Sequence, residues 1–165
     1  MNTDHAVGNR STVCLADFTS PGLIIPHLQG NDMASALQEL SFPMQREGCV
    51  TDALQFYQGV LNREFLTGTV WDQGLAFPHG LVLGLEHPKF ALGRSERPII
   101  WRTNGLRQIK LIFLLAVPAT DWSQYILLES AFAKLGGESP FLTELRAAKD
   151  QSEIMSVLQQ IKLRR

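Results

Sequence analysis

The pattern of apolar and polar positions in the first half of the chain predicts two amphipathic helices. The first begins after Asn31 or Asp32, either of which can act as its N-cap. Pro43 predicts a kink or an early stop in this helix. Its apolar positions are Met33, Ala36, Leu37 and Leu40. The second helix is predicted from a cap at Thr51 through Phe65. Its apolar stripe is Ala53, Leu54, Tyr57, Val60 and Leu61.

Shorter apolar runs in the middle of the chain predict strands. Residues 68–84 are rich in glycine and indicate a loop, a short strand and a loop. Residues 90–93 and 99–101 are predicted strands around a turn at residues 95–98. Residues 109–117 are almost continuously apolar, which is typical of a strand covered by helices on both faces.

Three further helices are predicted after this strand. The first covers residues 122–135 and ends before a glycine pair that suits a C-cap. The second has Ser139 as its cap and Pro140 in its first turn. The third begins at Asp150, with Glu153 three positions later in a capping-box arrangement. Its apolar stripe is Ile154, Val157, Leu158 and Ile161.

This order of elements predicts the α/β class, as a single three-layer domain in which a mixed β-sheet is flanked by helices on both faces. A length of 165 residues suits one domain with one core. We expect the domain to span residues 13–165, behind a flexible polar N-terminal arm at residues 1–12.

Charge and composition exclude several classes of partner. The 15 basic and 16 acidic side chains nearly balance, so no whole-molecule field favours nucleic acid or an anionic membrane. The N-terminus has no apolar signal core, and the longest apolar run is far too short to span a bilayer. Cys14 and Cys49 show no metal spacing and are interpreted as reduced, small apolar residues. We therefore expect a cytoplasmic protein without direct membrane insertion, nucleic-acid partner, metal or cofactor.

Four histidines are the candidates for chemistry. His5 falls in the predicted arm, His27 follows a proline, and His87 lies in a predicted turn, so surface or packing roles are favoured for these three. A metal site built from His79 and His87 has no supporting ligand motif.

His79 has a distinct setting, at the end of a short apolar strand between Pro78 and Gly80. A phosphoryl acceptor needs a neutral ring nitrogen that faces solvent and nearby backbone N–H groups, and glycine lets the backbone approach an anion. Arg63 could pair with phosphate oxygens and the hydroxyl of Thr69 could donate to them. A structural turn at His79, and an exposed ion pair between Arg63 and its neighbour Glu64, remain alternatives.

The chain resembles the EIIA domains of the fructose/mannitol class of the phosphoenolpyruvate-dependent sugar phosphotransferase system, a class that includes the nitrogen-regulatory EIIA proteins. The resemblance covers residues 15–161. Its strongest part is the pair Arg63-Glu64 followed by Leu75-Ala76-Phe77-Pro78-His79-Gly80. Supporting blocks are residues 85–88, 91–95, 112–118 and 141–161.

The resemblance implies a mixed sheet flanked by helices and a phosphohistidine at His79. In this family the matching histidine accepts phosphate from the phosphocarrier protein HPr, or from its nitrogen-branch relative. The group then passes to a cysteine of an EIIB domain, or the modified protein acts as a regulator. Arg63 would steady the phosphate, with Thr69 and Gly80 supporting the site.

The sequence departs from the family pattern at Tyr125, which stands where the family usually has a second histidine. A tyrosine hydroxyl can donate a hydrogen bond to phosphate but carries no cationic charge at neutral pH. Residues 70–73 are also bulkier than the family tends to be, and Asp72 among them would repel a phosphate unless it is turned away. These departures, and the absence of attached EIIB or EIIC segments, favour the alternative of a regulatory protein-binding module with little or no phosphotransfer. A metal-dependent hydrolase is a distant third hypothesis, for want of ligands.

Overall fold

The computed structural model describes residues 12–103, 105–137 and 139–163. The helices are α1 (Met33–Arg46), α2 (Ala53–Leu66), α3 (Ser123–Gly136), α4 (Pro140–Ala147) and α5 (Gln151–Gln160). The strands are β1 (Ile24–Ile25), β2 (Val70–Trp71), β3 (Leu75–Ala76), β4 (His79–Val82), β5 (Lys89–Arg102) and β6 (Leu106–Pro118). Short 3-10 helices are η1 (Leu15–Phe18), η2 (Pro21–Leu23) and η3 (Asp72–Gly74).

Strand β6 lies at the centre of the sheet. On one side it pairs antiparallel with β5, which in turn pairs parallel with β1. On the other side both β3 and β4 pair parallel with β6, one after the other along the same edge. Strand β2 adds antiparallel to β3. The sheet is therefore mixed, as predicted.

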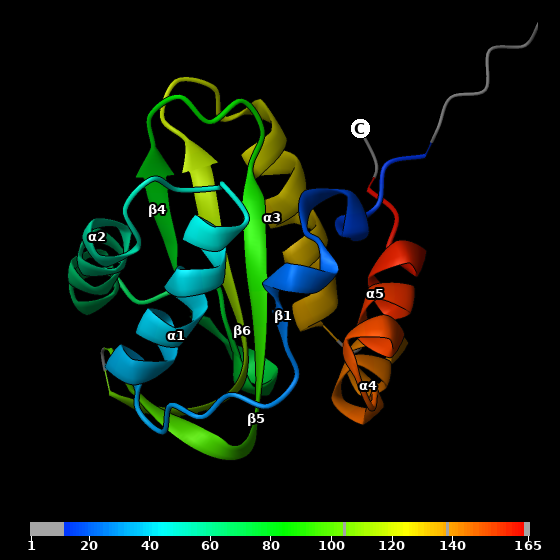
Figure 1. Cartoon of the computed structure of the whole chain (residues 1–165). Coiled ribbons are helices and arrows are strands. Elements are labelled where there is room, and N and C mark those ends of the chain that lie inside the picture. The colour runs from blue at the N-terminus through cyan, green and yellow to red at the C-terminus, as the bar shows by residue number, and fades with distance from the viewer. Residues whose placement is uncertain (1–11, 104, 138, 164–165) are drawn as a thin grey trace, which may run out of the picture.

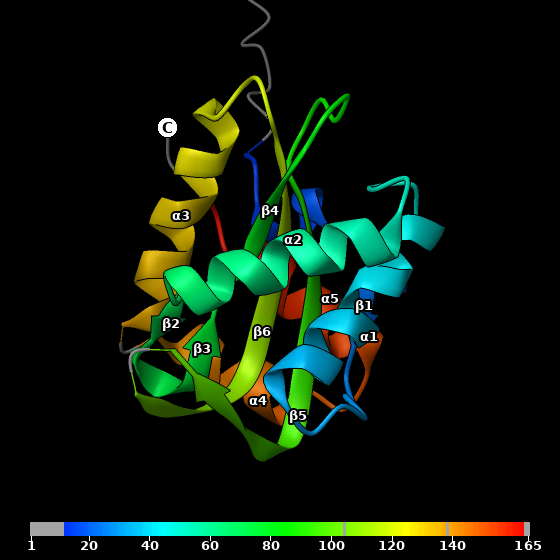
Figure 2. The ribbon, with the colours of Figure 1, turned by 90° about the vertical axis from the view of Figure 1, so that its left-hand side faces the viewer.

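Alternate residues of β6 face two separate apolar layers. Leu111, Phe113 and Leu115 pack in the layer beneath α3, α4 and α5, whereas Ile112 and Leu114 pack in the layer beneath α1 and α2. Figure 1 shows the two groups of helices on opposite sides of the sheet, and Figure 2 shows α1 and α2 crossing in front of the strands. The predicted three-layer α/β domain, with a central strand buried on both faces, is confirmed.

Helix α1 begins where the sequence predicts and ends later. The side chain of Asp32 caps it by accepting a hydrogen bond of 2.7 Å from the N–H of Ser35. The predicted early stop at Pro43 is wrong, because the helix continues to Arg46. Pro43 lies in the last turn, where it removes only one N–H donor, and it is buried next to Met44.

Helix α2 begins one residue later than predicted. Asp52, not Thr51, is the N-cap, and its carboxylate accepts a hydrogen bond of 3.1 Å from the N–H of Gln55. The buried face also differs from the predicted stripe: Phe56 is buried, whereas the predicted core residue Leu54 is 54% exposed.

The two predicted strands at residues 90–93 and 99–101 are parts of one strand, β5. The predicted turn between them is wrong, because the chain does not reverse. Instead the pairing with β6 shifts from Arg94 opposite Leu111 to Ile99 opposite Ile109. The extra residues, which include Pro98 with no N–H to donate, are accommodated as a bulge.

The glycine-rich segment 68–84 holds more sheet than predicted. It contains β2, β3 and β4 where one short strand was expected, because the free edge of β6 offers backbone partners to successive short pieces. The three C-terminal helices are confirmed. The caps of α4 and α5 form: Ser139 accepts from the N–H of Phe141 at 3.2 Å, and Asp150 from that of Glu153 at 2.9 Å. The predicted capping box is not formed, because the side chain of Glu153 accepts from the N–H of Lys149 at 2.6 Å and not from that of Asp150.

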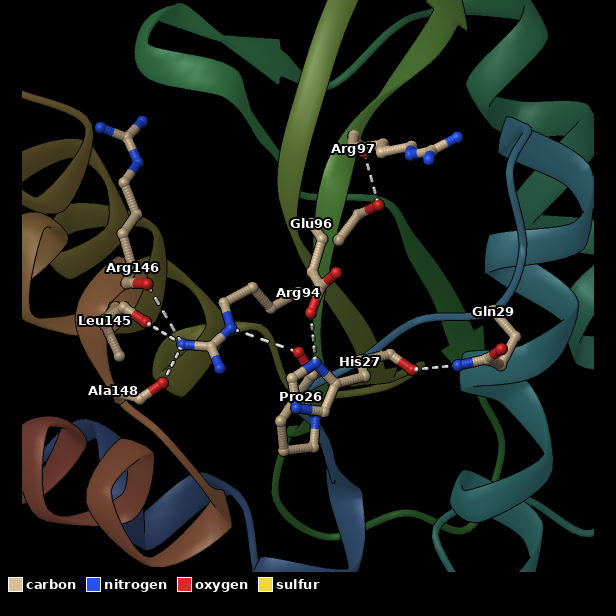
Figure 3. A network of polar contacts seen from close by, with 10 residues as sticks. Pro26, His27, Gln29, Arg94, Glu96, Arg97, Leu145, Arg146 and Ala148 are labelled. Atoms are coloured by element: carbon tan, nitrogen blue, oxygen red, sulfur yellow. Dashed lines mark hydrogen bonds and ion pairs between the residues drawn. The ribbon is translucent and has the colours of Figure 1, made fainter.

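Arg94, in the middle of β5, joins three segments through a network of polar contacts (Figure 3). Its Nη1 donates to the carbonyls of Leu145 at 2.9 Å, Arg146 at 3.3 Å and Ala148, which lie at the C-terminal end of α4. Its Nε donates to the carbonyl of Pro26 at 3.2 Å. The guanidinium thus satisfies helix-end carbonyls and adds a positive charge at the negative end of the helix dipole.

The predictions for the N-terminus lie mostly outside the described residues. The arm at residues 1–12 is described only at Thr12, and His5 is not described. Cys14 and Cys49 are both buried and free, as expected of small apolar residues. Among the described residues, no helix is long and apolar enough to cross a membrane.

Candidate functional site around His79

His79 is the first residue of β4, on the edge of the sheet next to β6. It pairs with Leu115, and the chain reaches it from β3 through Phe77 and Pro78. The carbonyl of Pro78 accepts a hydrogen bond of 2.9 Å from the N–H of Leu115. The Pro78-His79-Gly80 motif therefore continues the sheet edge, and the structural turn considered for it is not formed.

Gly80 lets β4 lie tightly against α2. A Cβ at this position would lie 2.7 Å from the ring of Phe56 and 3.0 Å from the side chain of Val60. Because successive residues of a strand point to opposite faces, the side chain of His79 is directed to the other side, toward α3. The ring of Tyr125 on α3 lies there, with its centroid 5.6 Å from that of His79.

The imidazole of His79 is half-buried and has one nitrogen engaged. Nδ1 lies 3.4 Å from the carbonyl oxygen of Phe77, which can only accept, so this contact requires the proton on Nδ1 and leaves the lone pair on Nε2. Burial lowers the pKa of His79 below its usual 6.5; the bond to Phe77 partly opposes this, and the Arg63 charge lowers the pKa further. The ring is therefore neutral at pH 7, with Nε2 available as a nucleophile or acceptor.

Arg63 lies near the end of α2, which packs against β4. It is half-buried and lines a hollow of about 420 Å³ together with Gly80 and Phe56. Its charge lowers the pKa of both His79 and Tyr125, so its field reaches both groups. No carboxylate lies within ion-pair distance of Arg63 among the described residues, so its charge is available to an anion.

Glu64 is buried beneath the loop that follows α2, with only 1% of its surface exposed. Its carboxylate accepts from the indole Nε1 of Trp101 at 2.9 Å and from the N–H of Thr69 at 2.8 Å. The hydroxyl of Thr69 donates to the same carboxylate, whose oxygens lie at 3.0 and 2.9 Å. The alternative of an exposed ion pair with Arg63 is therefore wrong, and Glu64 instead fixes the start of the loop leading to His79.

Tyr125 remains uncharged at neutral pH. Burial raises the pKa of its hydroxyl above 10, the carboxylate of Glu129 raises it further, and the Arg63 charge acts in the opposite direction. The ring of Trp122 meets that of Tyr125 edge to face, with centroids 5.8 Å apart. The hydroxyl can thus donate one hydrogen bond but supplies no positive charge beside His79.

The residues predicted for the site lie in two neighbouring hollows. Thr69, His79 and Tyr125 line a smaller hollow of about 200 Å³ on the α3 side. Arg63 and Gly80 line the larger hollow on the α2 side. The structure thus places all five predicted residues within one region, divided by β4 into a side with a cation and a side without one.

Glu129 and Trp71 are among the residues of the smaller hollow that were not predicted to support the site. Glu129 follows Tyr125 by four positions, and a helix over residues 122–135 places both on one face, so the spacing could have revealed it. Trp71 comes from β2 and meets Phe77 edge to face, with centroids 5.6 Å apart. The sequence indicated Trp71 only as part of the bulky stretch at residues 70–73, without a role of its own. Asp72 is exposed and lines neither hollow.

Among the described residues, no group of three or more His, Cys, Asp or Glu side chains is arranged to hold a metal ion. His87 lies on the surface, where its Nδ1 is 2.9 Å from the amide oxygen of Gln124. His27 is also exposed and pairs with Glu96 at 3.3 Å. These two histidines thus have surface partners.

Comparison with known proteins places this chain in a family. The family model described as "Phosphoenolpyruvate-dependent sugar phosphotransferase system, EIIA 2" matches residues 17–161. A nitrogen regulatory protein of Bradyrhizobium diazoefficiens is 31% identical over 149 residues, covering 87% of this chain and 94% of that protein. The fructose-like EIIA component of Escherichia coli K12 is 25% identical, covering 81% of this chain and 90% of that protein.

Solved structures show the same fold. The nitrogen regulatory protein IIA-Ntr of Neisseria meningitidis superposes with a TM-score of 0.74 at 20% identity, covering 87% of this chain and 97% of that one. The mannitol IIA of Escherichia coli superposes with a TM-score of 0.69 at 15% identity, covering 84% and 97%. The chain therefore belongs to the EIIA 2 family of the phosphoenolpyruvate-dependent sugar phosphotransferase system.

Proposed function

We propose that this protein is a cytoplasmic phosphoryl carrier that accepts phosphate from an HPr-type phosphocarrier on His79 and passes it to a cysteine of an EIIB domain. The observation that carries this proposal is the state of His79. Its Nδ1 is engaged with the carbonyl of Phe77, and burial keeps the ring neutral. The lone pair on Nε2 is then the nucleophile.

The first step exchanges one N–P bond for another. The Nε2 lone pair attacks the phosphorus of the donor's phosphohistidine, an Nε2–P bond forms, and the electron pair of the breaking bond returns to the donor's ring nitrogen. The proton on Nδ1 stays in place, held by the carbonyl of Phe77. Arg63 offsets charge on the transferring phosphoryl oxygens, and the hydroxyl of Tyr125 can donate one hydrogen bond to them. Gly80 supports the site by letting β4 pack tightly against α2, and Thr69 supports the loop beside the site.

The second step returns the lone pair to Nε2. A cysteine thiolate of the EIIB domain attacks the phosphorus, an S–P bond forms and the Nε2–P bond breaks. A solved relative of this fold is a complex of mannitol enzyme IIA with phosphorylated enzyme IIB from Escherichia coli, which supports an EIIB partner for this chain.

Phosphorylation on His79 is tested by incubation with phosphoenolpyruvate, enzyme I and HPr, followed by intact-mass measurement. The wild type should gain the mass of one phosphoryl group, and His79→Ala should abolish the gain. His87→Ala, at an exposed histidine that lines neither hollow, is the matched control and should label as the wild type does. Absence of label on the wild type, under conditions that label a known EIIA domain, would refute the carrier proposal.

A regulatory protein-binding module is the second candidate. It is supported by the name of the Bradyrhizobium relative, a nitrogen regulatory protein. It is also supported by the wall of the smaller hollow, where Tyr125 brings no positive charge and Glu129 brings a negative one. In this function the phosphorylated or unphosphorylated chain docks on a regulated protein and turns over slowly.

The Tyr125→His variant tests whether slow phosphoryl transfer would be caused by the missing positive charge or by slow docking of the partner. If the missing cation limits phosphoryl transfer, the variant should accept phosphate at least roughly tenfold faster, which corresponds to about 1.4 kcal/mol of transition-state stabilisation. Tyr125→Phe removes the hydroxyl without adding charge and is the control. An unchanged rate in the histidine variant would show that charge on the α3 side does not limit transfer.

A further inference from the structure

The smaller hollow beside His79 has walls suited to a ligand of opposite charge to phosphate. Its volume is about 200 Å³, which admits a compact group of a few heavy atoms. Four of the nine lining residues are Phe, Tyr or Trp: Trp71, Phe77, Tyr125 and Phe132. Phe77 and Phe132 stack at 4.7 Å and are buried, so they form its floor. Trp71 is 38% exposed and Tyr125 is partly exposed, so both are accessible at its rim.

Glu129 is the carboxylate of this wall. It is exposed, and no Lys, Arg or His lies within ion-pair distance of it among the described residues. Arg63 lines the other hollow. The carboxylate raises the pKa of both Tyr125 and His79, whereas the Arg63 charge on the other side of β4 lowers the pKa of both. The walls therefore carry one negative charge and no positive one.

The hydrogen-bonding groups of the hollow also favour a donor. The carboxylate of Glu129 only accepts, and the free Nε2 of neutral His79 is an acceptor. The hydroxyl of Thr69 already donates to Glu64. An ammonium ion offers several N–H donors to these acceptors, and its charge is attracted to the faces of tryptophan and tyrosine rings.

We propose that the hollow between β4 and α3 binds a small organic ammonium ion, held by the carboxylate of Glu129 and the ring faces of Trp71 and Tyr125. Such a ligand places a positive charge beside His79 on the side where the family's second histidine is replaced by Tyr125. Where His79 is phosphorylated, a step that rests on the proposed function, the cation and the phosphoryl group stabilise each other reciprocally. The ligand would therefore regulate how long the phosphoryl group is retained.

Three probes of nearly equal shape test the charge preference: tert-butylammonium, tert-butanol and pivalate. They carry one positive charge, no charge and one negative charge. The readout is the upfield shift of the methyl protons in ligand-observed NMR, which aromatic ring faces produce in a bound group. The unmodified chain is used, so the result does not depend on whether His79 accepts phosphate.

We expect tert-butylammonium to bind with a dissociation constant on the order of millimolar and at least roughly tenfold more tightly than tert-butanol. Glu129→Gln should remove that difference in affinity. Trp71→Leu should reduce the upfield shift. Glu144→Gln, at an exposed glutamate of α4 outside the hollow, is the matched control and should bind as the wild type does.

Equal affinity for the three probes, or a preference for pivalate, would overturn the proposal. Binding of tert-butylammonium that survives Glu129→Gln and Trp71→Leu unchanged would also overturn it, because the cation would then lie elsewhere. Displacement of the cation by a neutral polyol such as mannitol at equal concentration would show a sugar site instead. Loss of labelling at His79 with these binding results intact would refute the carrier function and leave the cation site standing.

Discussion

The buried carboxylate of Glu64 provides the strongest test of how the loop before His79 is held. It accepts from the indole N–H of Trp101 and from both the N–H and the hydroxyl of Thr69, at distances between 2.8 and 3.0 Å. Trp101 is fully buried, so its N–H has no access to water. We predict that Glu64→Ala destabilises the protein substantially, whereas Glu64→Gln costs much less.

The loss of stability expected for Glu64→Ala depends on which hydrogen-bond donors lose their acceptor. Leaving the indole N–H of Trp101 buried and unsatisfied costs about 1–3 kcal/mol. Each hydrogen bond from Thr69 to a charged acceptor is worth about 1.5–3 kcal/mol, discounted here because Thr69 is half-exposed and can rehydrate. Non-additivity reduces the sum, so Glu64→Ala should cost about 3–5 kcal/mol. Glu64→Gln keeps one acceptor oxygen and the side-chain shape, and should cost about 1–2 kcal/mol.

Equilibrium unfolding in urea measures these differences, with the midpoint and the m-value fitted together. Gln58→Ala, at an exposed position of the same helix, is the control and should change stability by less than about 0.5 kcal/mol. A double-mutant cycle of Glu64→Gln with Trp101→Phe should give a coupling energy of about 1 kcal/mol or more. A loss below about 1 kcal/mol for Glu64→Ala would refute the reasoning, because the donors would then find other partners.

Three further predictions follow from the contacts around the sheet. Arg94→Met removes the hydrogen bonds to the end of α4 and to Pro26, and should lower the free energy of unfolding in urea by about 2–4 kcal/mol. An unchanged unfolding midpoint would show that water replaces these bonds. Gly80→Ala should destabilise the protein by about 1–3 kcal/mol, because its Cβ would lie 2.7 Å from the ring of Phe56. Gly59→Ala, at a helix position where a Cβ would have nothing within 4 Å, should stabilise it by about 0.5–1 kcal/mol. Equal effects of the two substitutions on stability would contradict the steric argument. Burial lowers the pKa of His79 below 6.5, so as the pH falls the unfolded chain protonates this imidazole before the folded chain does, and folding stability declines below about pH 6.5. His79→Gln should flatten that decline. An NMR titration midpoint of His79 at or above 6.5 would contradict this prediction.

The layered fold could be predicted because it is encoded by a long apolar run and by short-range capping residues. The run at residues 109–117 lies within β6, whose alternate residues pack into both apolar layers. The caps at Ser139 and Asp150 mark α4 and α5, because a side-chain oxygen that accepts from the first turn is a short-range feature. The division of residues 68–84 into three short strands was not predicted, because β3 and β4 form only against the edge of β6 and β2 forms only against β3.

Features that depend on tertiary partners were mispredicted or missed. Pro98 suggested a turn, yet β5 passes through as a bulge because β6 holds the residues on either side of it. Glu64 suggested a solvent-exposed charge, and only the placement of Trp101 shows that it is a buried acceptor. His79 was predicted from its motif, whereas Trp71 lies in the hollow because β2 pairs with β3 beside it.

The two walls around His79 set the electrostatic conditions for any group bound to its Nε2. On the α2 side Arg63 offers a positive charge, whereas on the α3 side Tyr125 is neutral and Glu129 is negative. A dianionic group on Nε2 would lie on the α3 side, where the Arg63 charge attracts it across β4 and the carboxylate of Glu129 repels it. With a histidine cation in place of Tyr125, both walls would attract it. If His79 carries a phosphoryl group, as proposed above, these charges should hold it less firmly than two cationic walls would and should favour onward transfer or hydrolysis over storage, unless the proposed ammonium ligand enters the smaller hollow.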